Sequence, residues 1–207
     1  MPTYDHCLVN TNNDYIENDL TSYVVEFIEK VYGATKLNEN LKFIANALDE
    51  NSTDTPKNVI RKYLANEFFK DHCKKYQNRP IYWQLDSGKN GGFRALIYLH
   101  RYDENTLPTA RFNYLHDLQW KYEQEKDRLE KVIENSSITS EKAKAKKELD
   151  LINKQIVECQ AYDEILNHAT NMKINLDLDD GVKVNYQKLQ KLDGDKDKNI
   201  LSTYLKF

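Results

Sequence analysis

The feature that most constrains this chain is an apolar seam with heptad spacing between residues 115 and 166. Two runs carry the seam, at Leu115, Leu118, Tyr122, Leu129 and Val132 and then at Ala145, Leu149, Ile152, Ile156, Cys159 and Leu166. Glu125 and Asp163 interrupt it. Such a seam is buried when two helices pack along it. Because the polar stretch 134–140 separates the runs, the sequence predicts a long antiparallel helical hairpin, with coiled-coil packing, over residues 107–171.

The segment before this hairpin is also helical in its pattern. Apolar residues at helical spacing predict one helix between Asn18 and Gly33, a second near residues 37–48 and a third that starts at Thr55-Pro56. A capping hydroxyl followed by proline is a specific helix start. The 207 residues include only six glycines and four prolines, which is too few for a barrel of many strands.

Two segments switch to a period of two. Alternating apolar residues flank the glycine-containing turn 87–92, at Ile81, Trp83 and Leu85 and at Phe93, Ala95, Ile97 and Leu99. This pattern predicts a β-hairpin at 80–100 that packs on the surrounding helices. A second small hairpin is predicted near the C-terminus, because Ile174, Leu176 and Leu178 alternate before the turn signal Asp180-Gly181.

The patterns together predict a mainly α chain with small β-hairpins, an α+β fold. We expect a helical segment with a β-hairpin at 1–106, the antiparallel helical hairpin at 107–171, and a short β-hairpin and tail at 172–207. These parts are expected to form one structural unit from which the helical hairpin projects. The charged tail from Gln187 onward is expected to dock weakly or to fray.

The charges are unevenly distributed although the net charge is only −3. Residues 1–56 carry three basic and ten acidic residues, residues 57–101 carry ten basic and three acidic residues, and residues 102–207 carry seventeen and twenty. A basic middle segment is typical of nucleic-acid contact, but it can equally pair with the acidic segment before it.

The sequence predicts no catalytic, cofactor-binding or metal site. Ser87 lies in Asp-Ser-Gly and not in a glycine–serine elbow, and the glycines at 88, 91 and 92 fit neither a phosphate loop nor a dinucleotide fingerprint. Asp193, Asp195 and Asp197 match three positions of a calcium loop, but Lys198 stands where that loop needs glycine. Three cysteines, and neither a signal peptide nor a membrane-length apolar run, predict a cytoplasmic location.

The best binding constellation consists of cations on the two hairpins. The candidates for DNA contact are Arg79, Lys89, Arg94 and Arg101 around the β-hairpin and Lys142, Lys144, Lys146 and Lys147 on the helical hairpin. Cations contact phosphates, and the nearby aromatic side chains of Tyr82, Trp83 and Tyr98 can stack on bases. Alternatively, Trp83 belongs to the core and the cations form a solvated face.

Two runs of sequence resemble a known family. Residues 79–102, RPIYWQLDSGKNGGFRALIYLHRY, are similar to a stretch near the C-terminus of the PglX family, the adenine-specific DNA methyltransferases of BREX phage-defence systems. Residues 162–166, YDEIL, and 174–186, INLDLDDGVKVNY, resemble the terminal block of that family. The resemblance covers about residues 60–190.

The resemblance implies a large enzyme that uses S-adenosylmethionine to methylate adenine in non-palindromic sites and so marks DNA as self. The Asn-Pro-Pro-Tyr motif of such enzymes does not occur here, nor does their glycine-rich cofactor loop. We therefore expect a non-catalytic C-terminal part, in which Met1 is an artificial start or the start of a split reading frame. No catalytic or cofactor residue carries over, and S-adenosylmethionine belongs to the parent enzyme.

Two functions follow as hypotheses. In the first, the chain contacts double-stranded DNA through the cations named above and acts as a scaffold for the missing N-terminal catalytic domain of a BREX or restriction-modification-like system. In the second, the helical hairpin is a protein interaction module that docks the catalytic domain or other BREX subunits. Neither hypothesis involves a membrane, and no group of residues supports an independent small enzyme.

Overall fold

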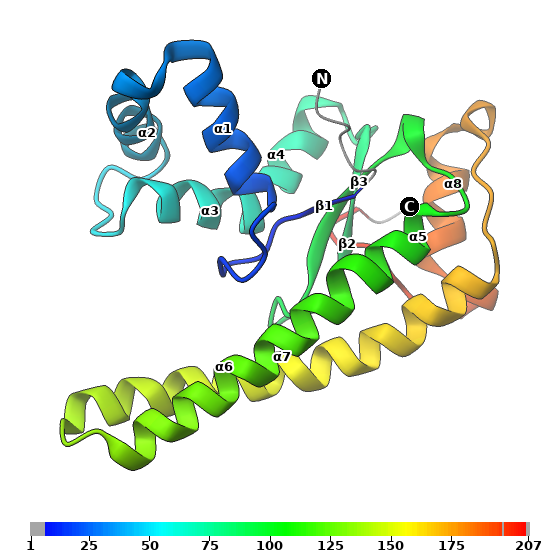
Figure 1. Ribbon diagram of the computed structural model, residues 1–207. Helices are drawn as coiled ribbons and strands as arrows, with labels where there is room; N and C mark the ends of the chain where they lie inside the picture. The colour runs from blue at the N-terminus through cyan, green and yellow to red at the C-terminus, as the bar shows by residue number, and fades with distance from the viewer. Residues whose placement is uncertain (1–6, 196, 206–207) are drawn as a thin grey trace.

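A three-stranded antiparallel sheet lies at the centre of the molecule (Figure 1). The computed structural model describes residues 7–195 and 197–205. The strands are β1 (Cys7–Val9), β2 (Tyr82–Asp86) and β3 (Arg94–Tyr98), in the order β1-β3-β2. β2 and β3 confirm the predicted hairpin at 80–100, with Trp83 opposite Ile97. β1 was not predicted, because three residues are too few to show a period.

Four helices form the N-terminal part. They are α1 (Leu20–Tyr32), α2 (Ala34–Leu48), α3 (Pro56–Asn66) and α4 (Phe68–Lys75). The predicted cap of α3 is present, because Thr55 Oγ1 accepts a hydrogen bond from Asn58 N at 3.3 Å, and α1 is capped by the Asp19 carboxylate, which accepts one from Ser22 N at 2.8 Å. α1, α2 and α3 share a small apolar core of their own, which consists of Ile28, Leu41, Ile60 and Leu64.

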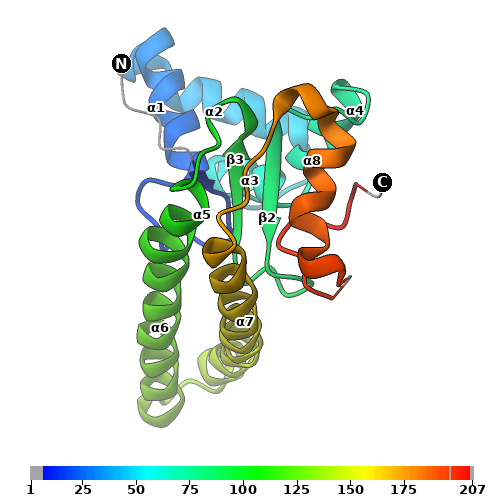
Figure 2. The ribbon, with the colours of Figure 1, turned by 90° about the vertical axis from the view of Figure 1, so that its right-hand side faces the viewer.

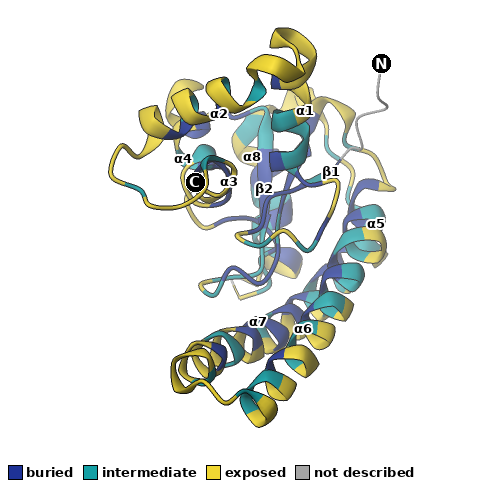
Figure 3. Ribbon diagram, turned by 60° about the vertical axis from the view of Figure 1, so that its left-hand side comes forward, coloured by how far each residue is buried: buried dark blue, intermediate teal, exposed yellow. Residues whose placement is uncertain are grey.

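The predicted helical hairpin is confirmed and projects from the rest of the chain (Figure 1). It consists of α5 (Thr106–Thr109), the π-helical segment η2 (Ala110–Leu115), α6 (His116–Asn135) and α7 (Thr139–Asn171). Leu118, Leu129 and Ile152 are buried seam residues, and Figure 3 shows buried positions along the contact between α6 and α7, with exposed residues outside it. No helix among the described residues combines the length and apolar character that a membrane crossing requires.

The sheet is covered on both faces. On one face Trp83 is fully buried, and its ring lies 5.1 Å from the ring of Tyr186, edge to face. On the other face Tyr82 contacts His72 of α4, with ring centroids 5.6 Å apart. This burial on both sides explains why Gln84 is only 5% exposed although it alternates with apolar residues.

The predicted C-terminal β-hairpin is wrong. The 3₁₀ turn η3 (Leu178–Asp180) leads directly into the helix α8 (Gly181–Gln190). Tyr186 and Leu189 are buried at helical spacing, and the Asn185 side chain bonds to the backbone of Asp177 across the turn. Asp180-Gly181 therefore starts a helix, because packing of the residues after it outweighs the short alternation before it.

Of the two alternatives expected for the tail, weak docking or fraying, fraying is wrong for its described part. After the turn η4 (Leu192–Gly194), the chain packs Ile200, Leu201 and Leu205 into the main core. Leu201 forms a bridge to Leu85, and Ser202 N donates to Gln84 O at 2.8 Å. The tail thus covers the outer edge of β2. The mainly α fold with a small β component is confirmed.

Candidate nucleic-acid interface

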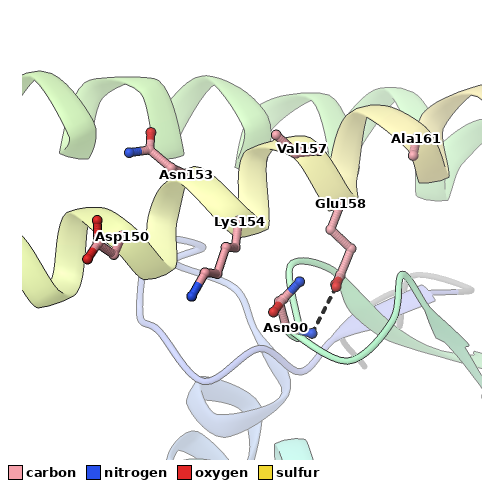
Figure 4. Close-up of a pocket in the computed structure, with 7 residues that line it drawn as sticks. All are labelled: Asn90, Asp150, Asn153, Lys154, Val157, Glu158 and Ala161. Atoms are coloured by element: carbon pink, nitrogen blue, oxygen red, sulfur yellow. Dashed lines mark hydrogen bonds between the residues drawn. The ribbon is translucent and has the colours of Figure 1, made fainter.

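The turn between β2 and β3 is held by one carboxylate of α7 (Figure 4). Glu158 accepts hydrogen bonds from Ser87 Oγ at 2.7 Å, from Asn90 N at 2.8 Å and from Gly92 N at 2.9 Å. Burial by itself would raise the pKa of Glu158, but these donors outweigh burial and lower it. The ionised carboxylate therefore fixes the turn against the base of the helical hairpin.

Further contacts make this turn rigid. The Tyr122 hydroxyl donates to Gly92 O at 2.7 Å, and Gln155 Nε2 donates to Asn90 O at 3.1 Å. A Cβ atom at position 92 would lie 2.8 Å from the Cys159 Sγ atom, so only glycine permits this close approach. Lys89, at the exposed tip of the turn, is consequently carried by a fixed backbone.

A groove runs beside the turn along the outer side of α7. It has a volume of about 700 Å³, and its lining residues include Asn90, Asn153, Lys154 and Asp150. Figure 4 shows Lys154 one helical turn from Glu158, on the side of α7 that faces the turn. The groove offers amide and ammonium donors to a ligand, together with two acidic side chains, Asp150 and Glu158.

The protein itself binds the guanidinium group of Arg94, one of the candidate cations. Its Nη1 atom donates to Ala65 O at 3.1 Å and to Asn66 Oδ1 at 2.9 Å, and its Nε atom lies 3.4 Å from Asp86 Oδ1. Burial, the largest influence, raises the pKa of Asp86. Arg94 thus joins the hairpin to the end of α3, and its assignment as a DNA contact stays a prediction.

The structure does not bring the eight candidate cations together. Lys89 lies at the turn of the β-hairpin, whereas Arg79 and Arg101 are exposed at the opposite end of the two strands. The four lysines of the helical hairpin form a third group in the first turns of α7, at positions 142, 144, 146 and 147. Lys142 Nζ donates to the backbone oxygen of Glu134 at 3.3 Å, and the other three are exposed.

At least half of the cations in the basic middle segment form ion pairs. Five of its ten cations are paired, as Arg61–Asp19, Lys62–Asp54, Lys70–Glu67, Lys74–Asp71 and Arg94–Asp86. Two of these acids, Asp19 and Asp54, come from residues 1–56, and the other three lie within the basic segment itself. Lys57, Lys75, Arg79 and Lys89 form no ion pair with any residue in the described ranges.

The aromatic residues of the β-hairpin are not arranged as a stacking platform. Trp83 is a core residue, as the alternative interpretation held. Tyr82 and Tyr98 are half-buried and pack against each other, with ring centroids 5.0 Å apart. Nor do the described residues contain a group of three side chains that could hold a metal ion.

One cluster was missed from the sequence. Asp163, the polar exception in the seam, forms a two-bonded ion pair with Arg111, at 2.8 and 2.9 Å, and also contacts His116 at 2.9 Å. Burial works against ionisation of Asp163, but the hydrogen bonds from these two partners lower its pKa. Arg111 lies in the π-helical segment, beside the exposed ring of Phe112, and Trp120 is 60% exposed further along α6.

Comparisons with known proteins identify relatives of this chain. It is 47% identical over 193 residues to the adenine-specific methyltransferase PglX of Lacticaseibacillus casei (strain Zhang), and 41% identical over 189 residues to the adenine-specific methyltransferase BrxX of Escherichia coli O9:H4 (strain HS). These matches cover 92% and 89% of this chain but only 16% of each relative. No family model matches the chain. The resemblance to PglX is confirmed, and the chain spans about one sixth of the length of the relatives it matches.

Proposed function

We propose that this chain is a non-catalytic part of an adenine-specific DNA methyltransferase of a BREX-type phage-defence system, and that it contacts duplex DNA and supports the catalytic part. The observation that carries the proposal is the similarity over nine tenths of the chain to PglX and BrxX, in a sequence that lacks the Asn-Pro-Pro-Tyr motif. No catalytic or cofactor role is proposed for these residues, and S-adenosylmethionine would bind elsewhere in the parent enzyme.

Unpaired cations on a fixed framework support the DNA contact. Lys89 and Arg79 lie at the two ends of a hairpin whose backbone is held by α4, α7 and the tail. Because their backbone is held, less conformational entropy is lost when these cations meet phosphates than if they lay on a mobile loop. Phosphate contact orients an enzyme on the duplex without reading bases, which is the role proposed here.

The test is the affinity of the chain for a mixed-sequence duplex, measured by fluorescence anisotropy at low salt. Reversal of the three exposed lysines of the helical hairpin, in a K144E/K146E/K147E variant, reports whether that hairpin takes part. We expect the unmodified chain to bind, and we expect a weaker complex wherever a reversed cation meets DNA. Absence of binding by the unmodified chain would refute DNA contact.

A second candidate function is docking of the catalytic part by the helical hairpin, and the exposed aromatic rings of η2 and α6 favour it. Phe112 and Trp120 are 54% and 60% exposed, and Arg111 stacks on Phe112 at 4.8 Å while Asp163 holds its guanidinium. Exposed Trp and Phe on a rigid base are typical of protein interfaces. The test adds this chain to the remaining part of the Lacticaseibacillus casei relative: a Trp120→Ala variant should lose co-elution, and unchanged co-elution would refute docking through α6.

A further inference from the structure

We propose that the pocket between the α4–β2 loop and the start of α8 binds one backbone phosphate of duplex DNA, with Arg79 and Lys183 as the contacting cations. This inference rests on the proposed DNA contact and selects one of the separated groups of cations as its anchor. Lys183 was not among the residues singled out from the sequence.

The pocket joins two segments that are about a hundred residues apart in the chain. It has a volume of about 560 Å³ and is lined by residues 77–79 of the loop, by Asp180 at the end of η3 and by residues 181–183 of α8. Figure 2 shows the end of α4 and the start of α8 at the same end of the molecule. Arg79 and Lys183 are both exposed, and neither forms an ion pair with a described residue.

The loop that carries Arg79 has a fixed conformation. Gln77 and Asn78 have left-handed backbones, with φ of 52° and 60°, which lets the chain reverse immediately after α4. Asn78 N donates to Cys73 O at 2.8 Å, and Arg79 N donates to Tyr76 O at 2.9 Å. The buried residue Pro80 follows. Arg79 is therefore presented from a rigid loop, which reduces the entropy lost when it binds.

The charge and chemistry of the pocket suit a phosphodiester. Asp180 is the acidic residue among the described lining residues, and Lys188 Nζ lies 3.2 Å from its carboxylate. The charges of Arg79 and Lys183 are consequently not cancelled within the pocket. A guanidinium can donate two parallel hydrogen bonds to phosphate. The side-chain amide groups of Gln77 and Asn78 are further donors.

The distribution of unpaired cations favours the pocket at Arg79 over Lys89 and over the lysines of α7 as the phosphate site. Lys75, four residues before Arg79, is also unpaired among the described residues, so three cations without acidic partners surround the loop. Lys89 lies at the other end of the hairpin, where the groove beside the turn is lined by Lys154 but also by the carboxylates of Asp150 and Glu158. The four candidate lysines of α7 are flanked by Glu141 on one side and by Glu148 and Asp150 on the other, and these negative charges weaken their joint positive potential.

The experiment compares salt dependence of duplex binding for the full chain and an R79A/K183A variant. Loss of one phosphate contact should reduce the magnitude of the slope of log affinity against log salt by about 0.9 and weaken binding at least roughly tenfold at moderate salt. An R79K/K183R variant should restore most of the slope. The matched control, K36A/K42A, removes two exposed lysines of α2 and should keep the slope of the unmodified chain.

Each result decides between stated alternatives. If the unmodified chain binds and R79A/K183A retains its slope, the pocket assignment is wrong although the DNA contact stands. If the unmodified chain fails to bind at low salt, both fail. If inorganic phosphate at matched ionic strength stabilises the unmodified chain but not the variant, while the DNA slope is the same for both, the pocket takes free phosphate and not DNA. Urea unfolding midpoints must agree among variants, as expected for exposed positions.

Discussion

The three hydrogen bonds by which Glu158 holds the β2–β3 turn, called the Glu158 clamp below, give the sharpest stability prediction. Glu158→Ala removes the acceptor of three hydrogen bonds, from Ser87, Asn90 and Gly92. A hydrogen bond to a charged group contributes about 1.5–3 kcal/mol in favourable cases. Because Glu158 is half-buried, water replaces part of what is lost. We therefore expect the free energy of unfolding to fall by about 2–4 kcal/mol, which corresponds to roughly 4–16 °C in Tm for a chain of this size.

Glu158→Gln separates the charge from the shape of the side chain. The amide retains one oxygen acceptor but directs an NH₂ group at a backbone donor, so we expect a loss of about 1–2 kcal/mol. Urea unfolding followed by circular dichroism measures both variants. Glu164→Ala is the matched control, since Glu164 is an exposed glutamate of the same helix. A loss below about 0.5 kcal/mol for Glu158→Ala, the scatter of neutral surface changes, would refute the clamp.

The pH dependence of the clamp follows from the direction of its pKa shift. The pKa of Glu158 is lower in the folded chain than its ordinary value of 4.5. The unfolded chain therefore binds the proton more tightly, and the stability from this group is present above pH 4.5. It is lost as the pH falls through the folded pKa. The difference between the unmodified chain and Glu158→Gln should accordingly shrink in acid, and a difference that grows there would contradict the sign.

Three further stability predictions use the same urea assay. Asp19→Ala leaves the guanidinium of Arg61 buried without its counter-ion and should cost about 3–5 kcal/mol; a loss below about 1 kcal/mol would contradict it. Gly92→Ala forces a Cβ to within 2.8 Å of the Cys159 Sγ atom and should cost about 1–3 kcal/mol, so a neutral result would show that the turn can move away from α7. Leu201→Ala should cost about 2–5 kcal/mol because the tail is part of the core; a frayed tail would tolerate it.

The parts of the fold that were predicted from the sequence carry local signals. The seam between residues 115 and 166 has a regular period, and Asp19 and Thr55 cap helices whose apolar residues follow at once. The parts that were missed depend on distant partners. α8 is fixed by Tyr186 against Trp83, and β1 by its pairing with β3. Neither contact leaves a periodic trace in so short a segment.

For the candidate site, too, the sequence predicts only what depends on neighbouring residues, and contacts between distant residues are missed. The sequence identifies where cations are dense but not which of them the fold neutralises. In the sequence, Arg94 and Arg79 are both arginines of the predicted β-hairpin region. In the structure, Asp86 and Asn66 bind the guanidinium of Arg94, whereas Arg79 forms no ion pair with a described residue. The contribution of Lys183 depends on α8, which the sequence pattern had assigned to a strand. Asp163, in contrast, was detectable as a break in the seam, although its partner Arg111 was not.

The most direct test of a DNA-contacting role is the binding of the unmodified chain to a mixed-sequence duplex across a salt series, by fluorescence anisotropy. Phosphate contact by the unpaired cations predicts measurable affinity at low salt and a linear fall of log affinity with log salt, with a slope of about −2 or steeper. Failure to bind at the lowest salt, or an affinity that does not change with salt, would contradict that role.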